Sequence, residues 1–158
     1  MAIVKTVESY LHDHHVEYEL ITHPHTGSSM ETAESAHVPG DSLAKGVVLR
    51  DGDSYLMVVI PSDYHIELER LNELLKRDLA LADEDNLKDL FPDCELGAVP
   101  PIGQAYEIST FWDPGSSLGN VDEVFFEAGG HREVVCVSGE SFHELMAPAE
   151  RMEFSHHI

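Results

Sequence analysis

The run GVVLRDGDSYLMVVIP at residues 46–61 restricts the fold more than any other segment of this sequence. Two stretches rich in β-branched and aromatic residues, 46–50 and 54–60, flank the turn sequence DGD. This order predicts a β-hairpin, because glycine and aspartate favour tight turns and β-branched side chains favour strands. The second stretch has no polar alternation, which is typical of a central strand covered on both faces. We therefore expect a sheet with both faces buried at this point.

Apolar residues at helical or strand spacing predict the elements on either side of the hairpin. The expected helices cover residues 4–15, 29–36, 68–75, 83–90 and 141–146, with Asp83 and Ser141 as N-caps. The expected strands cover residues 16–22, 79–81, 105–112, 124–126 and 134–137. Because hairpins and helices are mixed without a βαβ repeat, the sequence predicts an α+β (mixed α/β) fold with a central, mostly antiparallel mixed sheet and packed helices.

The length of the chain, 158 residues, is that of one typical domain, and no shift in composition divides it. Hydrophobic residues make up 42% of the sequence, enough for the chain to fold around its own core. We expect a single domain over residues 1–146. Residues 147–158, with Pro148 near their start, are expected to form a C-terminal tail.

The charge of the chain is strongly negative, with 9 Lys and Arg against 30 Asp and Glu and a formal net charge of −21. A surface of this kind repels phosphate groups, so a broad face for nucleic acid, and DNA as a partner, are not expected. No run approaches the ~20 apolar residues that span a bilayer, and the N-terminus lacks the pattern of a signal peptide. Cys94 and Cys136 form no CxxC motif and no disulfide framework. These features predict a cytoplasmic protein without a membrane partner.

Eleven histidines at first suggest a metal site. His12 and His15 would share one helix face, and His23 and His25 lie two residues apart on a predicted loop. A third ligand is not evident, and the HExxH, HxE…CxxC and EF-hand patterns are absent. Serine-nucleophile and phosphate-loop motifs are absent as well. We therefore expect no metal and no cofactor.

Lys45 is one of only four lysines, and it lies at the start of the strongly apolar strand. In so acidic a chain, a cation in this place either pairs with a carboxylate or meets an anionic or carbonyl ligand. A structural salt bridge and a ligand-binding role are both consistent with its position.

The segment GAVPPIG at residues 97–103 is the second unusual element. Two prolines between glycines fix the backbone in a rigid, non-helical path and leave amide groups at residues 97–99 able to donate. A rigid loop of this kind can bind a carbonyl or an oxyanion. A plain connection between a helix and a strand is the alternative.

Several segments follow one another in a characteristic order: a loop with Thr22 and His23, DSLAKGVVL, VVIPSDYHIELERL, GAVPPIG and EAGGHREVVCVSGESFHEL. Together they resemble the YbaK/ProX-like family of aminoacyl-tRNA deacylases over roughly residues 10–145. That family includes freestanding proteins and the editing insertion of bacterial prolyl-tRNA synthetases. The resemblance implies a mixed α/β domain with a largely antiparallel sheet.

Members of this family hydrolyse the ester that joins a wrong amino acid to the 3′ end of tRNA, without a metal or a covalent intermediate. Lys45 matches the functional lysine, and Gly97 with Pro101 matches the GxxxP loop. The resemblance implies Lys45 and Gly97 as catalytic residues. The implied substrate-binding residues are His23, Val99, Pro100, Pro101, Gly129, Gly130 and His131. Many members carry Ser or Thr after the lysine, where this chain has Gly46.

The implied function is trans-editing of small amino acids, such as alanine or cysteine, on tRNA for proline. One alternative is a non-catalytic module of the same fold that binds an amino acid or a nucleotide, and another is a protein that binds metal through its histidines. The implied partners are the acceptor end of aminoacyl-tRNA, bound weakly because of the acidic surface, and an aminoacyl-tRNA synthetase that supplies affinity for tRNA.

Overall fold

A central mixed sheet organises the computed structural model, which describes residues 3–23, 36, 38–95 and 97–157. The described residues form eight strands in the order β1-β8-β7-β2-β3-β6-β9, with β5 paired to β2. These strands are β1 (Glu19–Thr22), β2 (Leu43–Asp51), β3 (Ser54–Pro61), β5 (Ala80–Leu81), β6 (Ser109–Trp112), β7 (Glu123–Glu127), β8 (Glu133–Ser138) and β9 (Glu150–Arg151). A second, two-stranded sheet pairs β4 (Tyr64–Ile66) with β10 (Ser155–His157).

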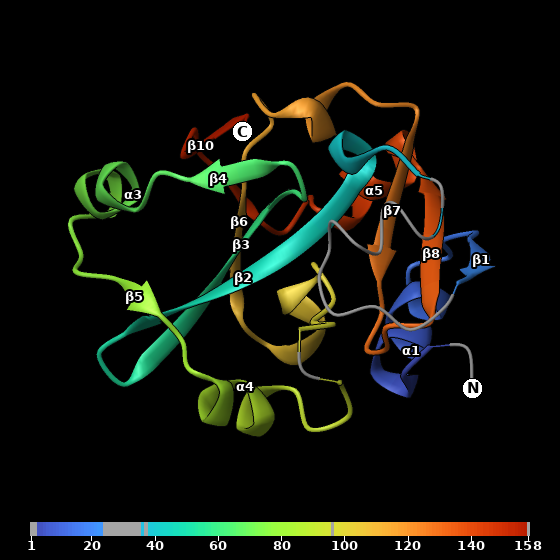
Figure 1. Cartoon of the computed structure of the whole chain (residues 1–158), viewed down its shortest axis with the longest axis horizontal. Helices are drawn as coiled ribbons and strands as arrows, with labels where there is room; N and C mark the ends of the chain where they lie inside the picture. The colour runs from blue at the N-terminus through green and yellow to red at the C-terminus, as the bar shows by residue number, and fades with distance from the viewer. Residues whose placement is uncertain (1–2, 24–35, 37, 96, 158) are drawn as a thin grey trace.

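Helices pack around this sheet, as the sequence predicts for an α+β fold. They are α1 (Lys5–Asp13), α3 (Leu68–Leu75), α4 (Glu84–Leu90) and α5 (Gly139–Leu145), with 3-10 turns η1 (Gly40–Ser42), η2 (Gly103–Tyr106) and η3 (Ser117–Gly119). Figure 1 shows α1 and α5 near β7 and β8, with α3 at the opposite end of the molecule. No helix in the described part of the chain has the length and apolar character needed to cross a membrane.

The hairpin predicted from the sequence is present. β2 and β3 pair antiparallel over their whole length, and Gly52 takes a left-handed φ of 62° in the two-residue turn between Asp51 and Ser54. β3 lies between β2 and β6, and its last six residues are buried, as expected for a central strand.

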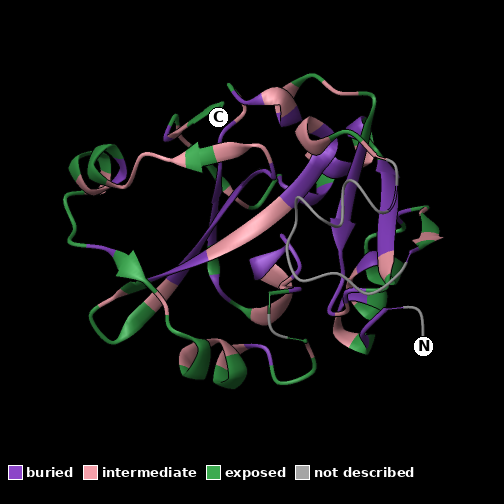
Figure 2. Cartoon of the chain, in the orientation of Figure 1, coloured by how far each residue is buried: buried purple, intermediate pink, exposed green. Residues whose placement is uncertain are grey.

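Buried side chains form separate clusters on the two faces of β3. Met57 and Val59 pack in a cluster with residues of α1 and α5, whereas Val58 and Ile60 pack in a second cluster with Leu71 of α3. This division follows from the alternation of side chains along a strand. Figure 2 shows the resulting buried centre, with the exposed residues on the outer helices and turns.

The antiparallel pairs β1–β8, β8–β7 and β2–β3 are joined by a short parallel pairing of β2 with β7. Only two residue pairs make up this junction, Leu43 with Phe125 and Ala44 with Phe126. Beyond it the two strands no longer pair, although β2 continues to Asp51 along β3. The sheet therefore opens between β2 and β7 immediately after Ala44 and Phe126.

Several predicted boundaries differ from the structure. The strand expected at residues 16–22 begins only at Glu19, because His15 takes a left-handed φ of 56° and Val16 N donates to Leu11 O in the turn after α1. Leu20 is 38% exposed rather than facing the core. The strand expected at 105–112 begins at residue 109, after the η2 turn. Most of the helix expected at 29–36 lies outside the described residues.

The N-cap of α5 is Ser138, not Ser141 as the sequence suggests. The side chain of Ser138 accepts a hydrogen bond from the backbone N–H of Ser141 at 3.0 Å. Ser138 therefore caps the helix, and Ser141 provides the capped amide instead of the capping side chain. By contrast, Asp83 caps α4 as predicted, in a capping box with Asn86.

The C-terminal segment, for which the sequence predicts a tail, contributes two strands. β9 pairs with β6 and β10 pairs with β4, and Phe154 between them is fully buried. Buried Asp113 fixes this segment, since its Oδ2 accepts from Phe154 N, Ser155 N and Ser155 Oγ at 2.8–3.2 Å. A buried aromatic side chain and the carboxylate that directly follows β6 thus hold the end of the chain to the domain.

Candidate functional site

Lys45 lies on β2, where its backbone pairs with Ile60 of β3, and it is partly buried. Burial lowers the pKa of Lys45, and attraction to Asp63 partly opposes this shift. Among the residues that the structure describes, no carboxylate forms a salt bridge with Lys45. The arrangement therefore differs from the surface salt bridge that composition alone allows.

The opening of the sheet brings Lys45 and Glu127 to equivalent positions on neighbouring strands. Each residue directly follows a member of the last register pair between β2 and β7, which joins Ala44 to Phe126. Side chains alternate along a strand, so Lys45 shares a face with Leu43, and Glu127 shares that same face with Phe125. Leu43 and Phe125 pack in one cluster on this face. Lys45 and Glu127 thus lie next to this apolar cluster, on the same face of the sheet, where β2 and β7 separate.

Glu127 holds the ring of His131. Its Oε2 lies 2.8 Å from His131 Nδ1, and the two side chains are only 6% and 5% exposed. The backbone N–H of His131 donates to Oε2 of Glu95 at 2.6 Å. Gly129, in the turn between the two residues, takes a φ of 97°, and a Cβ there would collide with Val4. The turn EAGGH therefore fixes His131 through both its side chain and its backbone.

The loop that begins at Gly97 lies against this turn. A Cβ on Gly97 would be 3.5 Å from both Cε1 and Nε2 of His131, so this edge of the imidazole faces the loop. Two backbone hydrogen bonds join the segments, from Gly129 N to Ala98 O at 2.9 Å and from Glu95 N to Gly129 O at 2.7 Å. Gly97 itself is exposed and takes a φ of 82°, which few other residues adopt.

The other end of the loop approaches β2 at Gly46, the residue after Lys45. A Cβ on Gly46 would lie 2.8 Å from Met57 Sδ and 3.3 Å from Pro100 O, so the loop packs where a larger residue would need room. This contact gives a physical reason for glycine at a position where many relatives carry Ser or Thr. Pro100 and Pro101 are buried, which suits a role in fixing the loop.

Of the backbone amides at residues 97–99 that the sequence predicts to be able to donate, one already has a partner. Ala98 N donates to Glu95 O at 3.1 Å, so this amide already has a partner within the turn. Val99 is partly buried, whereas Gly97 is the exposed residue of the three. Any backbone contact to a ligand would therefore be centred on Gly97.

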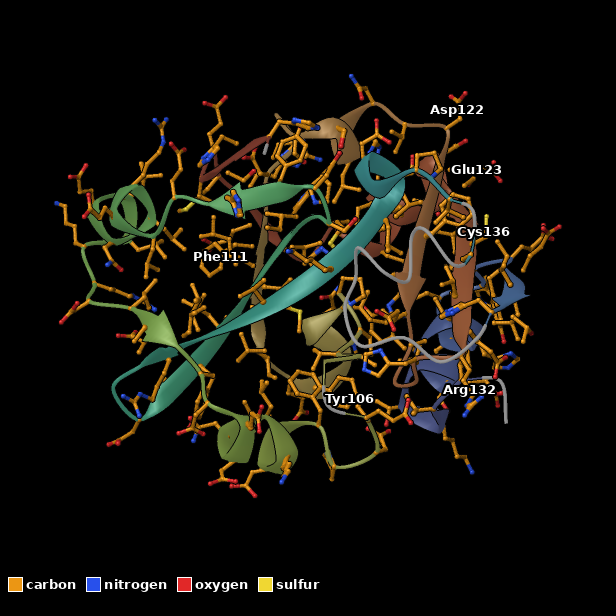
Figure 3. The ribbon with its side chains drawn as sticks, viewed as in Figure 1. Tyr106, Phe111, Asp122, Glu123, Arg132 and Cys136 are labelled. Carbon is orange, nitrogen blue, oxygen red and sulfur yellow. The ribbon has the colours of Figure 1, made fainter. Side chains whose placement is uncertain are left out.

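His23 reaches the same region from the end of β1. It is buried, and its backbone N–H donates to Arg132 O at 2.8 Å, directly after His131. Arg132 itself is exposed, and Figure 3 shows it near α1.

Two cavities flank the contact between the loop and the turn. The larger, of about 260 Å³, is lined by Ile3, Val4, Asp93, Glu95, Ala128, Gly129, Gly130, His131, Arg132 and Glu133. The smaller, of about 90 Å³, is lined by Leu87, Lys88, Phe91, Cys94, Glu95, Gly97 and Val99. Glu95 borders both cavities. Gly130 and His131 therefore line the larger cavity, and Gly97 and Val99 line the smaller one.

The two thiols do not have the properties of nucleophiles. Burial raises the pKa of Cys94 to about 12, and burial together with Glu123 raises that of Cys136 to about 12. Within the described part of the chain, no three His, Cys, Asp or Glu side chains are arranged to hold a metal ion.

The structure brings together most of the residues singled out in the sequence. Gly97, Gly129 and His131 are in one contact region, and His23 hydrogen-bonds to the residue after His131. Lys45 is placed relative to them only by its register position beside Glu127. Glu95 and Glu127 were missed by sequence reasoning. A signal for Glu127 exists, since it is the one charged residue that closes the apolar run VFF and it precedes a double glycine.

A family model described as aminoacyl-tRNA editing domain matches residues 23–145 of the chain. The matched range begins at His23 and includes every predicted site residue from Lys45 to His131. No curated protein is significantly similar in sequence.

Solved structures share the fold at low sequence identity. The hypothetical protein APE2540 is 21% identical, with a TM-score of 0.82 over 96% of this chain and 100% of that one. A proposed trans-editing enzyme for prolyl-tRNA synthetase is 19% identical, with a TM-score of 0.78 over 96% of both chains. A proposed signal transduction protein from Marinobacter aquaeolei VT8 is 20% identical, with a TM-score of 0.76 over 97% of this chain and 31% of that one.

Proposed function

Because the chain belongs to the aminoacyl-tRNA editing domain family, we propose that it hydrolyses the ester bond between a mischarged small amino acid and the 3′ end of tRNA. Alanine or cysteine on tRNA for proline is the proposed substrate. One observation carries the proposal: partly buried Lys45 and buried Glu127 each follow the last register pair between β2 and β7, and Glu127 holds the ring of His131, which lies against the Gly97 loop.

Lys45 supplies positive charge near the terminal nucleotide or the developing oxyanion. A partly desolvated ammonium acts strongly there, because charges interact more strongly in a site that excludes water. The backbone of Gly97 orients the aminoacyl carbonyl, and His131 contacts the substrate from the other side of the loop. Water is the nucleophile in this scheme.

The partner of the site is the acceptor end of tRNA alone. A net charge of −21 opposes wider contact with a polyanion, whereas a single-stranded end presents few phosphates. A synthetase that holds the body of the tRNA would raise the effective concentration of the ester at the site.

A deacylation panel tests the proposal. Purified protein is incubated with alanyl-, cysteinyl- and prolyl-tRNA for proline, and release of the amino acid is followed with time. We expect hydrolysis of at least one mischarged species, and a loss of at least about 100-fold in Lys45→Ala. Lys5→Ala, which removes an exposed lysine of α1, is the matched control.

Two outcomes would contradict the proposal: no hydrolysis across the panel, or full activity in Lys45→Ala. If no ester is cleaved but an amino acid or a nucleotide raises the melting temperature of the protein, the chain is a binding module of the same fold.

A further inference from the structure

Side chains from before and after the Gly97 loop meet at its base. Tyr106 (Figure 3) is the last residue of η2, the turn at the far end of the loop. Its hydroxyl donates to Oδ1 of Asp93 at 3.0 Å, and Sγ of Cys94 lies 3.4 Å from the same hydroxyl. Its ring packs on Phe91, with the ring centroids 4.6 Å apart. One tyrosine thus contacts three residues of the chain that leads into the loop.

Asp93 joins a third segment to this contact. Its Oδ2 accepts from Oγ1 of Thr6, in α1, at 2.8 Å, while Oδ1 accepts from Tyr106. Burial raises the pKa of Asp93, but the hydrogen bonds from Thr6 and Tyr106 contribute to a larger opposite effect, so the pKa lies below the ordinary 3.8. The ionised carboxylate therefore accepts from both neighbours at neutral pH, and it links α1 to both ends of the loop.

The chain between Asp93 and the loop is held on its other side by the Gly129 turn. Glu95 N donates to Gly129 O at 2.7 Å, and Ala98 N donates to Glu95 O at 3.1 Å. Gly97 lies within this turn, is exposed, and borders the cavity of about 90 Å³. A glycine has little conformational preference of its own. The direction of its backbone therefore depends on the hydrogen bonds on either side of it.

The contact between Tyr106 and Asp93 lies at the surface, because Asp93 is exposed and Tyr106 is partly buried. Water can replace a hydrogen bond in such a place, so loss of the bond costs little stability. The same loss frees the two ends of the loop from each other. The contact thus has a larger effect on the orientation of the loop than on the stability of the fold.

We propose that Tyr106 and Asp93 are positioning residues for ester hydrolysis, because their hydrogen bond holds the Gly97 loop in the orientation that receives the aminoacyl carbonyl. This inference rests on the proposed deacylase function. Both residues act through the backbone of Gly97 and have no contact with the substrate.

The test compares kcat and KM of Tyr106→Phe with those of the wild type, on the mischarged tRNA that the wild type hydrolyses fastest. Phenylalanine keeps the packing on Phe91 and removes only the hydroxyl. We expect kcat to fall by about 10- to 100-fold with KM within about 3-fold of wild type, since a small misplacement of a reacting group is costly. Asp93→Ala, at an exposed position, should lower kcat at least as much.

A double variant shows whether the two residues act through one hydrogen bond. Tyr106→Phe combined with Asp93→Ala should be no slower than Asp93→Ala alone. Tyr18→Phe is the matched control, because Tyr18 is also partly buried and packs against the same core cluster as Tyr106. Its kcat should equal that of the wild type.

Amide hydrogen exchange provides a readout of the loop that does not depend on activity. Exchange at Ala98 N–H should be at least about 5-fold faster in Tyr106→Phe than in the wild type, because the turn opens more often. Exchange at Val58, in the central strand β3, should be unchanged. The melting temperature should fall by no more than about 5 °C.

The outcomes distinguish this inference from the function on which it rests. Wild-type protein without deacylase activity would overturn the function, whatever the exchange at Ala98. Active wild type with unchanged kcat in Tyr106→Phe, additive losses in the double variant, or a lower kcat without faster exchange at Ala98 would overturn the positioning role alone. If Asp93→Ala does not fold, kcat and exchange in Tyr106→Phe decide: a large fall in melting temperature with wild-type kcat would make Tyr106 a structural residue.

Discussion

Lys45 combines a functional position with a cost in stability. Its ammonium is partly buried, and desolvation lowers its pKa below the ordinary 10.5 more than attraction to Asp63 raises it. A charged residue that lowers stability in this way is expected at a functional site, because an apolar side chain would stabilise the fold more at the same position.

Replacement of Lys45 by methionine should therefore abolish activity without loss of stability. Below the folded-state pKa the lysine is charged in both states, so the desolvation cost is fully present. Between the folded-state pKa and 10.5 the unfolded chain binds the extra proton, and wild-type stability rises with pH. We expect the Tm of Lys45→Met to be at or above wild type at pH 7, with the difference shrinking as the pH approaches 10.5.

Thermal unfolding of both proteins from pH 7 to 10 measures this effect. Lys88→Met replaces an exposed lysine and should show no such trend. A Tm of Lys45→Met well below wild type at pH 7 would mean that Lys45 is a structural residue.

At this scale the sequence identifies residues with unusual neighbours but not their partners. Lys45 and Gly97 could be singled out because one is a cation before an apolar strand and the other opens a loop with two prolines; their roles stay predictions. Glu127 carries only the weak signal of closing an apolar run, and Glu95 carries none, because acidic residues are common in this chain. Their importance comes from contacts with His131 that the fold alone creates.

Among the elements, the C-terminal strands differ most from the sequence-based expectation. β9 and β10 are too short to show the alternation of apolar and polar residues that identifies a strand, and each pairs with a strand far away in sequence. The β2–β3 hairpin was predictable because its turn and its partners are adjacent. Local patterns thus predict local elements, and they fail where pairing is distant.

Removal of the aromatic anchor should show that the C-terminal segment belongs to the fold. Phe154 is 0% exposed and packs with Leu71 and Phe111. We expect Phe154→Ala to lower the free energy of unfolding by about 3–5 kcal/mol, as for other buried aromatic residues. Urea denaturation followed by circular dichroism measures it.

Glu153→Ala provides the control for this substitution. Glu153 is the neighbouring residue, and its exposed ion pair with Arg70 is worth less than about 1 kcal/mol. Equal stability of Phe154→Ala and Glu153→Ala would indicate that the segment does not contribute to the core.

For the whole molecule, the acidic composition limits how much tRNA the protein can contact. We expect the isolated protein to bind uncharged tRNA with a Kd above about 1 μM at physiological salt. The reason is that the protein has few Lys and Arg side chains to neutralise tRNA phosphates. The dependence of log K on log salt should be shallow, near −0.7 for each phosphate contacted on a single strand. Fluorescence anisotropy with labelled tRNA between 50 and 300 mM salt, on the order of cellular ionic strength, measures both quantities. Submicromolar affinity or a steep slope would contradict contact with the acceptor end alone.

The class of the fold could be predicted from the sequence, and its topology could not. Mixed hairpins and helices indicate an α+β domain. The parallel junction of β2 with β7 leaves no pattern in either strand, since burial on both faces has the same sequence signature whichever neighbour is present. The candidate site lies at this junction, so its residues could be suspected individually but not assembled.

The short junction between β2 and β7 also sets the order in which the molecule can form. Leu43 and Phe125 meet across about 80 residues of intervening chain, and closing so long a loop is slow in folding. The hairpin of β2 and β3 can form early from local contacts, whereas Lys45 and Glu127 reach equivalent positions on neighbouring strands only after β7 has been synthesised and docked. During translation the N-terminal half therefore carries Lys45 before Glu127 has been made, so the two residues cannot come together until the second half of the chain is present.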